Sequence, residues 1–139
     1  MSVAAPAWWP DLDPLADDAR AALLAALRLP LRLRYLPSGI KPTPRQHAFC
    51  AYQGKEAFYG GAAGGGKSYS LLMSGLAYVD VPGYSALIIR RTLEELELPE
   101  ALIDLAHQWL GPTDAAWNGN KHRWTFPSGA TLTFGYLKN

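Results

Sequence analysis

A glycine-rich segment, Gly61 to Ser68, has the residue types and spacing of a site that holds phosphate groups. It fits the pattern G-x-x-x-x-G-K-[ST], with Gly66, Lys67 and Ser68 at its end. Glycines let the backbone turn tightly, so its N–H groups can surround a polyphosphate. In such sites the lysine reaches the β- and γ-phosphates, and the serine hydroxyl binds Mg²⁺. The segment therefore predicts ATP and Mg²⁺ binding; the alternative is a glycine-rich turn beside a solvated lysine.

A loop of this kind needs a strand before it and a helix after it. The apolar residues 57–59 predict a short strand that leads into the loop. Residues 67–81 predict a helix, because apolar residues recur there at helical spacing and Pro82-Gly83 follows. The continuous apolar run 85–89 predicts a strand buried on both faces of a parallel sheet. Together these segments predict one βαβ unit.

A short helix is predicted over residues 43–53, with Thr43 as its N-cap and Pro44 in its first turn. Gln46 lies on this helix. A glutamine amide can donate to N7 of adenine and accept from N6, so Gln46 is a candidate adenine-binding residue. The alternative is a surface glutamine on a short helix.

The strand 85–89 is followed by Arg90-Arg91, at the edge where α/β sheets hold their ligands. These guanidinium groups could contact a phosphate or reach the nucleotide of a neighbouring subunit. The alternative is ordinary pairing with Glu94 and Glu95. Thr92 and Glu95 predict a capping box that opens a helix. Pro99 interrupts this helix, and its inward-facing residues continue as Leu102, Ile103, Ala106 and Trp109.

The two ends of the chain differ in character. Asp13 and Pro14 open a predicted amphipathic helix that ends before Pro30, and the breaker-rich residues 31–44 predict a connector that wraps the domain. The last third predicts an antiparallel meander with one buried face. Its turns are Asn118-Gly119 and Pro127-Ser128-Gly129, and its alternating apolar residues are His122, Trp124, Phe126, Leu132, Phe134 and Tyr136.

Composition narrows the class of protein. The 139 residues are 49% hydrophobic and 18% charged, which suits one compact domain rather than two. A net charge of +1 gives no general basis for coating nucleic acid. Cys50 is the single cysteine, so it offers neither an internal disulfide nor a thiolate metal cluster. Without a secretory leader pattern or an apolar run of membrane-spanning length, we expect a soluble, intracellular protein.

Four segments in this order resemble the amino-terminal part of tailed-phage terminase large subunits. They are Pro44-Arg45-Gln46, the run Tyr59 to Ser68, the run Leu87 to Thr92, and Phe126 to Ala130 with Phe134-Gly135-Tyr136. The resemblance covers residue 44 to the last residue. It implies an ATP-driven motor that packages viral DNA into the capsid, working in the cytoplasm of the bacterial host and transiently at the procapsid. The implied partners are double-stranded DNA, the portal, the small terminase subunit and further copies of the chain.

The resemblance also implies roles for individual residues. The implied catalytic residues are Lys67, Arg90 and Arg91. The implied cofactor-binding residues are Gln46, Gly61, Ala62, Ala63, Gly64, Gly65, Gly66, Lys67, Ser68 and Tyr69, with Mg²⁺ bound by the Ser68 hydroxyl. The family's acidic (Walker B) strand and its nuclease carboxylates have no counterpart in this sequence.

The expected fold is therefore α/β: a partial P-loop NTPase, with a parallel sheet and flanking helices, followed by the antiparallel meander. Residues 1–42 form the amino-terminal helix and wrapping linker, and residues 43–139 form a truncated ATPase domain. Two other functions remain open at this stage: a non-catalytic nucleotide-binding remnant, and a small P-loop kinase-like phosphotransferase.

Overall fold

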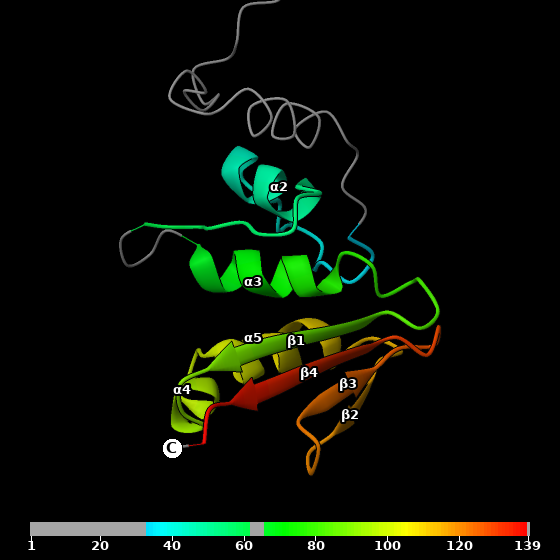
Figure 1. Cartoon of the computed structure of the whole chain (residues 1–139). Helices are drawn as coiled ribbons and strands as arrows, with labels where there is room; N and C mark the ends of the chain where they lie inside the picture. The colour runs from blue at the N-terminus through cyan, green and yellow to red at the C-terminus, as the bar shows by residue number, and fades with distance from the viewer. Residues whose placement is uncertain (1–32, 62–65, 139) are drawn as a thin grey trace, which may run out of the picture.

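The computed structural model describes residues 33–61 and 66–138, which form an α/β fold (Figure 1). The helix predicted before Pro30 lies outside these residues. The helices are α2 (Pro44–Ala51), α3 (Lys67–Leu76), α4 (Glu94–Glu97) and α5 (Leu102–Leu110). The strands are β1 (Ser85–Arg90), β2 (Ala116–Asn118), β3 (Arg123–Thr125) and β4 (Thr131–Tyr136), and they form one mixed sheet in the order β1-β4-β3-β2.

Strand β4 joins the two parts of the sheet. It pairs antiparallel with β3, which pairs with β2, so the predicted meander is confirmed. It also pairs in parallel with β1, from Ser85 opposite Thr131 to Arg90 opposite Tyr136. The sequence did not predict this second pairing. The meander is thus an extension of the parallel pair rather than a separate layer.

One face of the sheet carries the core. Ile88, Leu132 and Trp124 lie on this face and are almost fully buried. Helix α3 covers β1 and β4, because a side chain added at Gly75 would meet Leu132 at 3.0 Å and Ile88 at 3.6 Å. Helix α5 covers the meander, where the His107 ring lies 5.0 Å from that of Trp124.

The prediction that β1 is buried on both faces is wrong. Leu87 is 60% exposed and Ile89 is 47% exposed, while Ile88 between them is buried. Side chains alternate across a strand, and both α3 and α5 pack on the Ile88 side. The opposite face of β1 is therefore open in the part of the chain that the structure describes.

Two predictions around the glycine-rich segment need correction. Residues 57–59 do not form a strand, because they pair with no strand of the described sheet, and Phe58 is 94% exposed. The βαβ unit predicted there lacks its first strand. Helix α3 ends at Leu76 rather than near residue 81. Tyr84 Oη donates to Gly75 O, a carbonyl that a longer helix would use. The backbone bonds that follow run from residue i to residue i−3, as in Val79 N to Leu76 O and Val81 N to Tyr78 O.

The other predicted helices are close to those observed. Thr43 and Gln46 form a reciprocal capping box at the start of α2, and α2 ends at Ala51. Thr92 Oγ1 accepts from Glu95 N, while the Glu95 carboxylate accepts from Arg91 N instead of completing the predicted box. The inward-facing residues predicted for α5 are all buried.

The connector before α2 is held by a polar cluster. Tyr35 is buried, and its hydroxyl donates to Asp114 at 2.8 Å. Arg34 bonds to both Asp114 and Asp80 at 3.2 Å. Burial, followed by the hydrogen bond to Asp114, raises the pKa of Tyr35 from 10.0 to about 12. Tyr35 therefore anchors the described part of the connector predicted over residues 31–44, and it also packs edge-on against Phe126.

This raised pKa predicts alkaline destabilisation. An unfolded tyrosine ionises near pH 10, while folded Tyr35 keeps its proton to about pH 12. The contribution of this group to the free energy of unfolding is therefore complete below pH 10 and is lost between pH 10 and 12. At roughly 1.36 kcal/mol per unit of pKa difference, the loss is on the order of 2 kcal/mol. Urea unfolding at pH 9 to 12 measures this loss of stability. The Tyr35→Phe variant should show a shallower decline; an equal decline would assign the effect to other groups.

Candidate functional site

Helix α3 starts where the glycine-rich segment ends. Gly66 is its N-cap, with φ of 75° in the left-handed region that favours glycine. Ser70 N makes the first helical bond, to Gly66 O at 2.9 Å. The N–H groups of the turn before it have no partner within the helix, and the positive end of the helix dipole lies there. Lys67 and Ser68 therefore occupy the first turn, as predicted.

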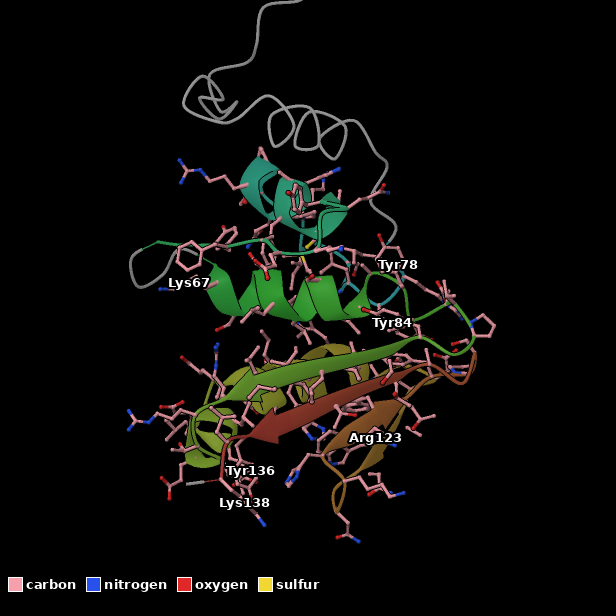
Figure 2. The ribbon with its side chains drawn as sticks, viewed as in Figure 1. Lys67, Tyr78, Tyr84, Arg123, Tyr136 and Lys138 are labelled. Atoms are coloured by element: carbon pink, nitrogen blue, oxygen red, sulfur yellow. The ribbon has the colours of Figure 1, made fainter. Side chains whose placement is uncertain are left out.

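Lys67 links the two ends of the loop. Its ammonium donates to Gly61 O at 2.7 Å. Gly61 has φ of 153°, again in the region that favours glycine. Ala62, Ala63, Gly64 and Gly65 lie outside the described residues. Figure 2 shows Lys67 at the loop end of α3.

A cavity of about 530 Å³ adjoins this helix start. Lys67 and Ser68 line it from α3, and Arg90 lines it from the carboxyl end of β1. These three residues carry two cationic groups and one hydroxyl, a combination suited to phosphate. The remaining lining residues are mainly apolar and aromatic: Phe49, Ala57, Phe58, Tyr59 and Leu71. The lining of the cavity therefore combines a few polar groups with mainly apolar and aromatic side chains.

The two arginines predicted at this edge separate. Arg90 lines the cavity, whereas Arg91 is exposed and is absent from its lining. Glu95 contacts Arg91 through the backbone N–H, at 3.2 Å. The ion pairs of the described residues do not include either arginine with Glu94 or Glu95. The structure therefore brings Arg90, and not Arg91, to Lys67 and Ser68.

Gln46 occupies a different position from the one that its predicted role suggests. Its side chain is 5% exposed and does not line the cavity. The amide oxygen accepts from Thr43 N at 2.8 Å, and the amide nitrogen donates to Gly66 O at 3.2 Å. Adenine binding by Gln46 stays a prediction. The predicted site residue Tyr69 is 40% exposed, contacts the Trp109 ring at 5.3 Å, and also lies outside the cavity lining.

Two residues that sequence reasoning missed connect α2 to α3. Ser70 is fully buried, and its hydroxyl donates to Gly66 O at 2.9 Å. The Cys50 thiol donates to Ser70 O at 3.8 Å, and burial raises the pKa of this thiol to about 12. A serine three residues after the motif lysine carries no distinctive pattern. The signal available in the sequence was its place on the inward face of the helix.

The residues present fit part of a magnesium–nucleotide site. Protein-bound Mg²⁺ commonly takes few protein ligands and completes its shell with water and phosphate oxygens. The Ser68 hydroxyl can supply one such ligand beside Lys67. Among the described residues, no three His, Cys, Asp or Glu side chains gather as a metal site of their own. The two parallel strands of the described sheet, β1 and β4, end in Arg90 and Tyr136, so neither ends in an acidic residue that could bind the ion.

Comparisons with known proteins do not add to this geometry. In the described residues, no helix has both the length and the apolar character needed to cross a membrane. No protein-family model matches the chain, and neither a curated protein nor a solved structure matches it.

Proposed function

We propose that this chain binds ATP with Mg²⁺ through residues 61–68, as the amino-terminal ATPase part of a tailed-phage terminase large subunit. The observation that carries the proposal is the cavity that Lys67 and Ser68, at the start of α3, line together with Arg90 from β1. A helix start, a lysine, a hydroxyl and a guanidinium around one cavity are the groups that bind a triphosphate. The four-segment resemblance supports the specific family, including a P-loop NTPase core.

Each residue then has a defined task. The first-turn N–H groups of α3 bind phosphate oxygens, and Lys67 adds charge-assisted bonds to the outer phosphates. An ammonium has three donors, so Lys67 can keep its bond to Gly61 O while it binds phosphate. Ser68 would hold Mg²⁺ through its hydroxyl oxygen, and the ion would supply positive charge to the phosphates. Arg90 lines the same cavity from the end of β1, where it can stabilise the charge of the transferring phosphate.

The wider biological role rests on the resemblance. In the intact motor, the proposed partners are double-stranded DNA, the portal, the small terminase subunit and further copies of the chain, in the cytoplasm of the bacterial host and at the procapsid. ATP hydrolysis by such a motor requires an acidic residue at Mg²⁺ as well as the groups described above. The cavity supports ATP binding, whereas turnover needs an acidic residue in addition to Lys67, Ser68 and Arg90.

Calorimetric ATP binding and steady-state hydrolysis, with and without double-stranded DNA, test the proposal. We expect ATP binding that requires Mg²⁺. Hydrolysis that DNA stimulates would support the motor. Binding without turnover would favour the non-catalytic nucleotide-binding protein. Phosphate transfer to a small acceptor would favour the kinase-like enzyme. A chain that binds neither ATP nor another nucleoside triphosphate would refute the proposal.

A further inference from the structure

We infer that Gln46 is a positioning residue for the phosphates: it fixes the peptide bond between Gly66 and Lys67, so that the first N–H of α3 points out of the start of the helix. This inference rests on the proposed function. In this role Gln46 raises the affinity of the chain for any triphosphate, whether or not the ligand carries a base. The role differs from adenine recognition in a way that can be measured.

The Gly66 carbonyl is held by three donors. Ser70 N and Ser70 Oγ each donate to it at 2.9 Å, from the next turn of α3. Gln46 Nε2 donates to it at 3.2 Å, from α2. Gln46 is the one donor of the three that comes from outside α3. It therefore ties the position of the loop end to a second helix.

Holding this carbonyl also sets the direction of the next N–H group. A trans peptide is planar, and its C=O and N–H point in opposite directions. Gly66 O points along α3 towards Ser70, so Lys67 N–H points the other way, out of the start of the helix. An anion at a helix start is bound through such N–H groups. The bonds to Gly66 O therefore orient a phosphate donor without touching the phosphate.

The amide of Gln46 is itself held firmly. Its oxygen accepts from Thr43 N at 2.8 Å, and the Thr43 hydroxyl accepts from Gln46 N at 3.3 Å. The side chain is buried, and a Cβ atom at Gly66 would lie 2.5 Å from Gln46 Nε2. The amide thus fills the space beside the loop end. Reading a base edge would require it to leave both partners, since it does not line the cavity.

The test compares two ligands that differ only in having a nucleoside: ATP and inorganic tripolyphosphate, each with Mg²⁺. Calorimetry on the full chain gives the Kd of each. We expect Gln46→Ala to weaken the binding of both ligands about tenfold, because one hydrogen bond that orients the Lys67 N–H is lost. The ratio of the two Kd values should stay unchanged. Ser70→Ala, which removes another donor to the same carbonyl, should act in the same direction on both ligands.

A matched control is Gln53→Ala, since Gln53 is an exposed glutamine beyond the end of α2. It should leave both Kd values unchanged. The backbone amide resonance of Lys67 in the ligand-free protein should move in Gln46→Ala and Ser70→Ala, but not in Gln53→Ala. A general loss of stability would not single out this amide. If Gln46→Ala fails to fold, Gln46→Glu keeps the acceptor for Thr43 N and removes the donor to Gly66 O.

Two results would overturn the inference while leaving the proposed function intact. One is a variant at Gln46 that loses ATP affinity but keeps tripolyphosphate affinity, which would assign Gln46 to the base. The other is a variant with both affinities unchanged. A wild-type chain that binds neither ligand would instead remove the proposed function, and this inference with it.

Discussion

The Lys67→Ala chain is expected to bind ATP at least about 100-fold more weakly than the wild type, a loss of about 2.7 kcal/mol. Lys67 is the cationic side chain in the first turn of α3, and it lines the cavity with Ser68 and Arg90. Charge-assisted bonds to phosphate are among the strongest that a side chain makes. Alanine also removes the bond to Gly61 O, which links the two ends of the loop. Calorimetric titration with Mg²⁺ and ATP measures the effect.

The matched control is Lys121→Ala, at an exposed lysine near the turn between β2 and β3. It removes the same charge from a place outside the cavity, so the affinity should stay within twofold of wild type. Thermal unfolding of both variants should be close to wild type, because Lys67 and Lys121 are both exposed. Equal ATP affinity in the wild-type and Lys67→Ala chains would show that residues 61–68 do not bind the nucleotide.

Local signals in the sequence predicted where several helices begin and where the meander turns. The N-cap at Thr43, the start of α3 at Lys67 and the turns of the meander each depend on a few neighbouring residues. The packed face of α5 also followed from spacing alone, since Leu102, Ile103, Ala106 and Trp109 are all buried. In each case the residues that determine the feature lie within one or two turns of it.

Features that depend on distant segments could not be predicted in the same way. The parallel pairing of β1 with β4 joins Ser85 to Thr131, across two helices and two strands. The run 85–89 reads as apolar throughout, and only the placement of α3 and α5 on one side decides that Leu87 is exposed. The apolar residues 57–59 likewise needed a partner strand. No local pattern reports whether such a partner exists.

The site shows the same division. The motif placed Lys67 and Ser68 in the first turn, and the strand end placed Arg90 near them. The bond from Gln46 to Gly66 O spans twenty residues, and the sequence offered only the chemistry of an amide, which suits a base edge as well as a carbonyl. The distinction between those two partners is a matter of burial and orientation, which come from the packing of α2 against α3.

That packing of helices on the sheet can be tested at Leu132, where α3 meets β4. Leu132 is fully buried, and its Cδ1 would lie 3.0 Å from a Cβ atom at Gly75. We expect Leu132→Ala to lower the free energy of unfolding by about 3 kcal/mol, from lost burial and the cavity left behind. Leu87→Ala makes the same chemical change on the open face of β1, where the residue is 60% exposed, and should cost about 0.5 kcal/mol or less.

A second substitution at the same contact sharpens the test. Gly75→Ala raises helix propensity by about 1 kcal/mol, but in the wild-type chain its new methyl group presses on Leu132. In the Leu132→Ala background that methyl group enters the emptied space, so Gly75→Ala should stabilise more there than in the wild type. Urea unfolding of the four chains gives the coupling, which we expect to reach at least about 0.5 kcal/mol for residues in contact. Strict additivity would mean that α3 does not cover this face of the sheet, and so would equal losses for Leu132→Ala and Leu87→Ala. In that case α3 and β1 would not be placed as they must be for Lys67 and Arg90 to line one cavity.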